Sequence, residues 1–139
     1  MAVTEACRFP DSSAGVDPLL AVANLDRALA FWVERMGAVA EVHWDSYALL
    51  RVGEGRLHLA VTGDPPPDRA VRLVPPIPDP HEATGEVVIR VADCQAVVEV
   101  LQHRGVEFLG PPATPAWGGE VRAFLRDPDG HLIEVSSRS

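Results

Sequence analysis

The stretch from Trp117 to Ser136 reads WGGEVRAFLRDPDGHLIEVS and decides how the end of the chain folds. Two β-type runs, Glu120–Arg126 and His131–Val135, flank the tetrapeptide Asp-Pro-Asp-Gly at positions 127–130. Proline presets φ at the second turn position and glycine accepts a positive φ at the fourth, so the tetrapeptide predicts a tight turn. We therefore expect the two runs to pair as a β-hairpin.

The second strand of this hairpin carries a carboxylate that needs an explanation. Because side chains alternate along a strand, Leu132, Glu134 and Ser136 share one face. Ile133 and Val135 face the other way. A charged group in mid-strand either faces solvent or points into a pocket, and the rest of the sequence bears on that choice.

Length and composition set broad bounds on the protein. A chain of 139 residues with 47% hydrophobic and 23% charged residues is typical of one globular domain. No apolar run approaches membrane-spanning length. The net charge of −8 argues against nucleic-acid binding as the main task, because phosphate contacts need a basic face. Binding of a neutral or cationic small molecule stays open.

The cysteines and the N-terminus indicate a cytoplasmic protein. Cys7 and Cys94 are far apart and lack metal-ligand spacing, which excludes a disulfide framework and suits a reducing compartment. Residues 1–15 lack a basic region followed by an apolar stretch, so we expect no signal peptide there. We expect these residues to form a loose tail.

The first half of the chain predicts a strand, a helix and three further strands. Asn24 is placed to cap the helix, because apolar residues recur at helical spacing up to Met36, and Gly37 then ends it. The expected strands are Val16–Val22, Val39–Trp44, Tyr47–Val52 and Arg56–Thr62.

Residues 63–85 interrupt this pattern with seven of the chain's 13 prolines. Proline lacks an N–H donor and breaks helices, so the segment predicts an irregular linker. A connection of this length within a compact domain is often a lid or another functional loop.

The second half of the chain repeats the order of the first. Superposing the tripeptide at 22–24 on that at 91–93 gives an offset of 69 residues. The expected elements are the strand Glu86–Val91, a helix with Cys94, Val97, Val98 and Leu101 on its apolar stripe, a strand at Glu107–Leu109 and the closing hairpin. This duplication predicts an α+β fold, a single domain over residues 16–137. Two pseudo-symmetric βαβββ modules, residues 16–62 and 86–137, form a curved, mostly antiparallel, cup-shaped sheet.

At this point the sequence resembles the vicinal oxygen chelate superfamily, which includes glyoxalase I, bleomycin-resistance proteins, fosfomycin-resistance enzymes and extradiol dioxygenases. The resemblance covers about residues 16–137 and rests on LDRALAFW at 25–32, WGG at 117–119 and DPDGHLIE at 127–134. It implies that the two modules curl into a cup that holds small molecules or metals. These motifs specify the fold better than the reaction.

Strand alternation indicates which residues line such a cup. In the strands at 17–22, 56–62 and 86–91 one face is uniformly apolar and the other mixes ionisable and apolar residues, as a binding cup requires. Four ionisable residues fall at pseudo-symmetric positions on the mixed face: Asp17, His58, Glu86 and Glu134. By the resemblance, these are the positions of the ligands in metal-using members, which implies a site for divalent Zn, Ni, Mn or Fe. The residues expected to contact a substrate are Tyr47, Leu49, Arg51, Arg90 and Trp117.

Each of these residues also has an ordinary structural explanation. Asp17 and Glu86 begin strands, where solvated carboxylates are common, and His58 fits a hydrogen-bonded wall residue equally well. Arg90 and Arg122 are able to pair with the carboxylates in place of a metal. Most metal-using members carry two histidines, or one histidine with Gln and Glu, and aspartate is unusual at the first position.

Two functions of different classes fit this pattern. The first is a metal-dependent enzyme of the lyase, isomerase/epimerase or dioxygenase type, with His58 and Glu134 as catalytic groups and ligands beside Asp17, Glu86 or both. The alternative is a metal-free protein that resembles the bleomycin-resistance branch and sequesters an antibiotic or other aromatic metabolite. Trp117 beside two glycines, the proline-rich lid and the acidic surface favour this alternative.

The resemblance also bears on assembly, because members commonly pair as homodimers and often complete the cup with strands from both chains. Apolar residues such as Trp44 and Ile77 are hard to bury in a monomer of this size. We therefore expect a two-fold homodimer with residues 63–85 near the interface or the cup mouth. Whether the cup forms within one chain or between two stays open.

Overall fold

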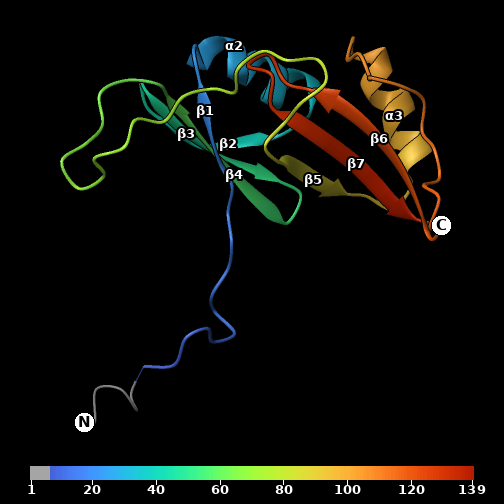
Figure 1. Ribbon diagram of the computed structural model, residues 1–139, viewed down its shortest axis with the longest axis horizontal. Helices are drawn as coiled ribbons and strands as arrows, with labels where there is room; N and C mark the ends of the chain where they lie inside the picture. The colour runs from blue at the N-terminus through green and yellow to red at the C-terminus, as the bar shows by residue number, and fades with distance from the viewer. Residues whose placement is uncertain (1–6) are drawn as a thin grey trace.

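Two β-sheets, one from each half of the chain, form the framework of the molecule (Figure 1). The computed structural model describes residues 7–139, so the first six residues of the expected tail lie outside the described part. The first sheet contains β1 (Leu19–Val22), β2 (Val39–His43), β3 (Tyr47–Val52) and β4 (Gly55–Val61), in the order β1-β4-β3-β2. The second contains β5 (Glu86–Arg90), β6 (Glu120–Arg126) and β7 (Leu132–Arg138), in the order β5-β7-β6.

Both predicted helices form and both are capped as expected. The first consists of α2 (Leu25–Leu29), which continues directly into η1 (Ala30–Arg35), a segment of π-helical hydrogen bonding. The Asn24 side chain accepts a hydrogen bond from the Arg27 N–H at 2.9 Å. The second helix, α3 (Cys94–His103), is capped in the same way by Asp93. Each helix is followed by a glycine of positive φ, as its C-terminal turn requires.

The strand register confirms the internal duplication. Leu19 of β1 pairs with His58 of β4, and Val88 of β5 pairs with Glu134 of β7. Leu19 and Val88 are 69 residues apart, which is the offset that the sequence predicts. Both pairings are parallel, whereas the remaining strand pairs are antiparallel. His58 and Glu134 therefore occupy equivalent positions in the two modules.

The strand expected at Glu107–Leu109 is wrong, and the second sheet has three strands instead of four. The segment still runs beside β6, where the Leu109 N–H bonds to the Phe124 carbonyl and Ala113 forms an isolated bridge with Arg122. Two consecutive prolines follow Gly110 and contribute no N–H donors. A continuous hydrogen-bond ladder therefore cannot extend along this segment.

One hydrophobic core joins the two modules on the helix side of the sheets. Leu57 and Leu59 of β4 belong to it, as do Ile133 and Val135 of β7. The opposite face of each sheet, turned away from the helices, is called the open face here. Because side chains alternate, the open face carries His58 in the first sheet and Glu134 in the second.

Two arginines at equivalent positions of the repeat bond the helix ends to each other. The Arg35 guanidinium donates to the Gly105 carbonyl at 2.8 Å, and that of Arg104 donates to the Arg35 carbonyl at 3.0 Å. Arg35 and Arg104 are separated by the repeat offset of 69 residues. Each side chain thus satisfies carbonyl groups that the other helix leaves free at its C-terminus.

The Asp-Pro-Asp-Gly turn is a second connection between the modules. Asp129 accepts hydrogen bonds from the Ala23 N–H at 2.8 Å and from the Arg27 guanidinium at 3.0 Å. His131 bonds through Nε2 to the Ala21 carbonyl at 2.7 Å, so that nitrogen carries the proton. The turn at the far end of the chain therefore fastens the second module to the end of β1.

The proline-rich linker runs from the first sheet to the second over this junction (Figure 1). The Thr62 hydroxyl bonds to the Leu73 carbonyl at 2.7 Å, and the Arg126 guanidinium donates to the Glu82 carbonyl at 3.3 Å. Val71, Val74 and Ile77 of the linker remain well exposed. No helix in the described part of the chain is long and apolar enough to cross a membrane.

Candidate functional site

The open face of the first sheet carries a chain of three hydrogen-bonded side chains. The Tyr47 hydroxyl lies 2.5 Å from His58 Nδ1, and His58 Nε2 lies 3.2 Å from Asp17 Oδ2. A carboxylate only accepts, so Nε2 donates its proton to Asp17, and in the Nε2–H tautomer Nδ1 accepts from the Tyr47 hydroxyl. The β3–β4 register brings Tyr47 beside His58, as the expected hairpin requires. This arrangement fixes both the plane and the tautomer of the imidazole.

The open face of the second sheet carries a pair of carboxyl groups, Glu86 and Glu134. Only 6% of Glu134 is exposed. Burial, followed by the hydrogen bond and the charge of Glu86, raises the pKa of Glu134 to about 7, while Arg122 acts in the opposite direction. Arg122 Nη1 lies 3.9 Å from Glu134 Oε1, so this ion pair is long. Near neutral pH the Glu134 carboxyl group is therefore only partly ionised.

Aromatic rings flank this carboxyl pair. The Arg122 guanidinium lies 4.8 Å from the ring centre of Trp117 and 5.1 Å from that of Phe124. Phe124 pairs with Glu134 across the β6–β7 ladder, so its ring lies on the same face as the carboxyl group. Trp117 is 69% exposed, which leaves much of its ring available for stacking on a ligand.

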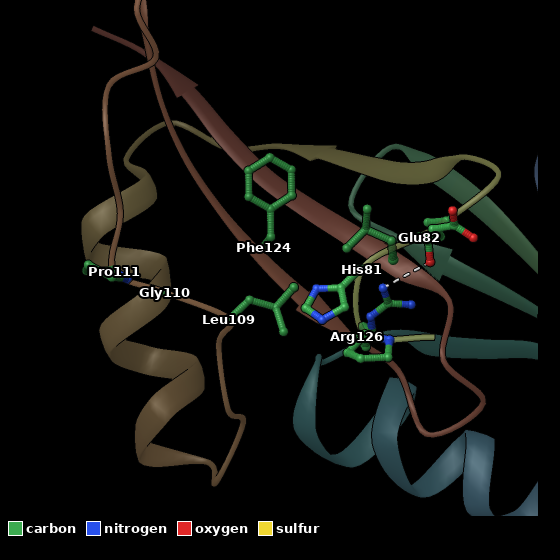
Figure 2. A pocket seen from close by; sticks show the side chains of 10 residues that line it. His81, Glu82, Leu109, Gly110, Pro111, Phe124 and Arg126 are labelled. Carbon is green, nitrogen blue, oxygen red and sulfur yellow. Dashed lines mark hydrogen bonds between the residues drawn. The ribbon is translucent and has the colours of Figure 1, made fainter. Parts of the chain in front are cut away.

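A cavity of about 420 Å³ adjoins Phe124 at the end of the sheet where the linker crosses (Figure 2). Phe124 and Leu132 of the open face form part of its lining, and Leu109 contributes to another wall. His81 and Arg126 are its polar groups, and Arg126 is held by the Glu82 carbonyl, as the dashed line in Figure 2 shows. The mixture of apolar walls and few polar groups is typical of small-molecule sites.

The structure places the four expected ligand residues in two separate pairs. Asp17 and His58 meet on the first sheet, whereas Glu86 and Glu134 meet on the second. Among residues 7–139, no three His, Cys, Asp or Glu side chains come close enough to hold one metal ion. A site with all four ligands therefore does not form within a single copy of the described chain.

The remaining expected contact residues lie around these two pairs. The strand register places Leu49 and Arg51 on the same face as His58, as predicted. Arg51 forms a long salt bridge with Glu41, whose carboxylate oxygen lies 3.8 Å from Arg51 Nε. Arg90 shares the open face with Glu86 but forms no salt bridge with a described residue. Of the two arginines able to neutralise the carboxylates, only Arg122 approaches one.

Sequence reasoning missed the residues that line the cavity, chiefly His81, Leu109, Phe124 and Arg126. Phe124 and Arg126 could have been found, because strand alternation places them on the face of Glu134 once the hairpin is recognised. His81 could not, because it lies in an irregular linker whose path depends on tertiary contacts.

The donor atoms of each pair suit a divalent cation. Imidazole and carboxylate groups are ordinary ligands of Zn²⁺, Ni²⁺, Mn²⁺ and Fe²⁺. Tyr47 bonds to Nδ1 of His58, which leaves Nε2, now bonded to the Asp17 carboxylate, as the nitrogen available to a cation. A cation beside Glu86 and Glu134 would take the place of the proton that their mutual repulsion now retains. Each pair supplies two ligands of a site that needs three or four.

Comparisons with known proteins agree with this architecture. The family model of the Glyoxalase/Bleomycin resistance protein/Dioxygenase superfamily matches residues 15–135. No curated protein matches the chain. A glyoxalase-related enzyme from Fulvimarina pelagi has a TM-score of 0.70 at 19% identity, over 91% of this chain and 88% of that one.

Two further solved structures share the fold. The bleomycin resistance determinant encoded on transposon Tn5 has a TM-score of 0.69 at 20% identity, covering 91% of this chain and 99% of that one. A glyoxalase/bleomycin resistance protein/dioxygenase from Nocardioides has a TM-score of 0.69 at 17% identity, covering 99% and 91%. On the family match and the shared fold, the chain belongs to the glyoxalase/bleomycin resistance protein/dioxygenase superfamily.

Proposed function

We propose that the protein is a divalent-metal-dependent enzyme that acts on a small oxygenated molecule by acid–base chemistry. In this proposal the site is assembled between two copies of the chain. The first module of one copy supplies Asp17 and His58, and the second module of the other supplies Glu86 and Glu134. The observation that carries the proposal is the carboxyl pair of exposed Glu86 and buried Glu134, in which Glu134 has a pKa of about 7.

A buried carboxyl group of neutral pKa is suited to general acid–base catalysis. The ideal catalytic pKa lies near the working pH, where the group both accepts and donates a proton readily. Glu134 meets this condition, and its open-face neighbours Phe124 and Leu132 line a cavity of about 420 Å³. Perturbed pKa values next to cavities are concentrated at functional sites. Structural ion pairs also perturb pKa values, but the Arg122 contact at 3.9 Å would lower this one.

The chain's own residues would divide the work as follows. His58 and Asp17, with one or both glutamates, would hold the cation, which when bound polarises a substrate oxygen. Glu134, or Glu86 when Glu134 is engaged, would move a proton to or from the neighbouring carbon or oxygen. Phe124 and Leu132 would hold the apolar part of the substrate.

Exposed apolar side chains support the pairing of two copies. Leu19 and Val88 lie on the open faces beside His58 and Glu134, where 45% of Leu19 and 50% of Val88 are exposed. Trp44, Val74 and Ile77 are more exposed still. Large apolar surface of this kind marks an interface in a soluble protein. A two-fold dimer in which the open faces of the two copies meet would bring the two halves of the site together.

Metal titration tests the proposal. Protein without a histidine tag is stripped of metal and titrated calorimetrically with Zn²⁺, Ni²⁺, Mn²⁺ and anaerobic Fe²⁺. We expect one of these ions to bind stoichiometrically, His58→Ala to abolish the binding, and the exposed-helix control His103→Ala to leave it unchanged. Failure of every ion to bind wild-type protein, or unchanged binding by His58→Ala, would contradict the proposal.

A metal-free binding protein is the second candidate, and Trp117 favours it. Trp117 has an exposed indole over the Arg122 guanidinium, and this arrangement suits the capture of a planar aromatic ligand. A thermal-shift screen with glycopeptide, enediyne and aromatic natural products distinguishes the candidates. Stabilisation by such a compound in the presence of chelator, lost in Trp117→Ala, would favour sequestration over catalysis.

A further inference from the structure

A second cavity lies where the two modules meet, against the first helix. Its volume is about 390 Å³. Its walls come from α2 and η1, from residues 105–107 after α3, and from residues 126–128 at the end of β6. None of the four expected metal-ligand residues lines it. This cavity shares Arg126 with the open-face cavity but contains none of the proposed metal ligands.

Three guanidinium groups line this junction cavity: Arg27, Arg35 and Arg126. Arg35 and Arg126 form no salt bridge with any described residue, and the hydrogen bonds of both go to backbone carbonyl groups. Arg27 pairs with Asp129 through one nitrogen, while about half of its side chain, 51%, is exposed. Each guanidinium group has N–H donors beyond those used in these bonds, so the cavity lining carries positive charge in a chain of net charge −8.

The two carboxylates of the lining do not neutralise these cations. Asp127 uses Oδ1 to accept from the backbone N–H groups of Asp129 and His131, and Oδ2 to accept from the Trp32 indole. Its oxygens are thus occupied by donors of its own turn and of the core. Glu107 lies on the exposed rim and forms no salt bridge with the arginines in the described chain.

The rest of the lining is mainly apolar, and part of it belongs to the hydrophobic core. Phe31 and Val106 are both buried members of the core cluster, and their side chains form part of the cavity floor. Ala30 lies beside them on η1 with little side chain to fill the space. A cavity that combines an apolar floor with several guanidinium groups suits a small apolar body that carries an anionic group.

We propose that this junction cavity binds a small organic anion, whose carboxylate or phosphate group bonds to Arg27, Arg35 and Arg126. Guanidinium groups recognise both anion types in bidentate geometry. Arg126 also lines the cavity on the open face and holds the Glu82 carbonyl of the linker. An anion that engages Arg126 competes with this carbonyl, so binding at the junction would loosen the linker above the open-face cavity.

Titrations with sodium phosphate and sodium benzoate, followed by NMR of the arginine Nε–Hε signals, test this proposal. We expect saturable shifts of Arg27, Arg35 and Arg126. Shifts with phosphate alone indicate a phosphate ester as the natural ligand class, and shifts with benzoate alone indicate an organic acid. Shifts with both indicate a site that accepts either group. Absence of saturation with both probes overturns the proposal.

The exposed residue Ala30 provides a matched pair of variants that spares the arginines. Ala30→Glu places a carboxylate among the guanidinium groups and should weaken probe binding by roughly tenfold or more. Ala30→Gln has nearly the same size without the charge and should retain most of the affinity. Equal binding by both variants overturns the proposal. His58→Ala should bind the probe normally, whereas loss of binding there would place the anion in the open-face site.

Discussion

At the scale of single residues, the environment of Glu134 supports the proposed acid–base role. A glutamate in water titrates near 4.5, but burial and the neighbouring Glu86 raise the pKa of Glu134 to about 7. The folded state therefore binds the proton more tightly than the unfolded state does. Stability from this group is fully present below pH 4.5 and is lost as the pH rises through 7.

Replacing Glu134 with glutamine tests this effect directly. The substitution keeps the size of the side chain and removes its titration. We expect Glu134→Gln to match the wild-type unfolding free energy near pH 5 and to exceed it by about 2–3 kcal/mol at pH 8. Urea denaturation across this pH range provides the measurement. A difference that does not change with pH would show that Glu134 titrates like an exposed glutamate.

Much of the residue-level picture could be predicted, because it follows from alternation and from the repeat. The offset of 69 relates Asp17 to Glu86, and counting back from the two hairpin turns aligns His58 closely with Glu134. Strand alternation then places His58 and Glu134 on the open face, as the register confirms. The separation of the four ionisable residues into two pairs could not be predicted. It depends on how the two sheets are oriented, and no local pattern encodes that orientation.

At the scale of elements, the Asp-Pro-Asp-Gly turn both closes the hairpin and holds the modules together. Burial raises the pKa of Asp127 above its usual value, opposed by His131 and the hydrogen bonds that the carboxylate accepts. Asp129 is also buried, and its Oδ2 has no hydrogen-bond partner in the described chain. The turn was predictable from its sequence, but its partners Ala23 and Arg27, more than 100 residues away, were not.

Asp129→Ala and Asp129→Asn separate the connecting role of the turn from its local role. Alanine removes the acceptor of the Ala23 N–H and the Arg27 guanidinium and should cost about 2–4 kcal/mol of unfolding free energy. Asparagine retains a carbonyl oxygen at the position of Oδ1 and should cost less than half as much. Chemical denaturation gives both values. Equal costs would mean that the charge, and not the pair of hydrogen bonds, matters.

Substitution of Gly105 tests the contact between Arg35 and the end of the second helix. Gly105 has a φ of +83°, and an added Cβ would lie 2.6 Å from Arg35 Nη1. Gly53 also has a positive φ, of +56°, but an added Cβ there meets nothing within 4 Å. Both alanine substitutions should cost about 1 kcal/mol for the backbone strain. Gly105→Ala should cost at least another 1 kcal/mol or so, because it displaces Arg35 from the Gly105 carbonyl. Similar thermal denaturation midpoints would contradict the importance of this contact.

Element types were predictable where short-range chemistry determines them, as at the caps Asn24 and Asp93. The expected strand at Glu107–Leu109 failed because the prolines after Gly110 prevent its extension. Residues 107–109 lie beside β6 but do not form a strand of their own. Their actual role is to form a wall of the open-face cavity through Leu109.

At the scale of the whole molecule, the proposed function requires two copies of the chain. The exposed apolar residues of the open faces and of the linker should be covered in the assembly. We expect sedimentation equilibrium at micromolar concentration to give about twice the monomer mass of 15.0 kDa. A single monomer mass over the whole concentration range would contradict this expectation.

Metal content of a mixed dimer tests the central claim most directly. His58→Ala and Glu134→Ala chains are co-expressed with different histidine-free tags, and dimers that contain both are isolated and reconstituted with the preferred metal. If the site joins the first module of one copy to the second module of the other, one of the two sites in the mixed dimer regains all its ligands. We therefore predict one tightly bound metal ion per mixed dimer and none in either variant homodimer. A mixed dimer that binds no metal, beside a wild-type dimer that does, would contradict the shared site.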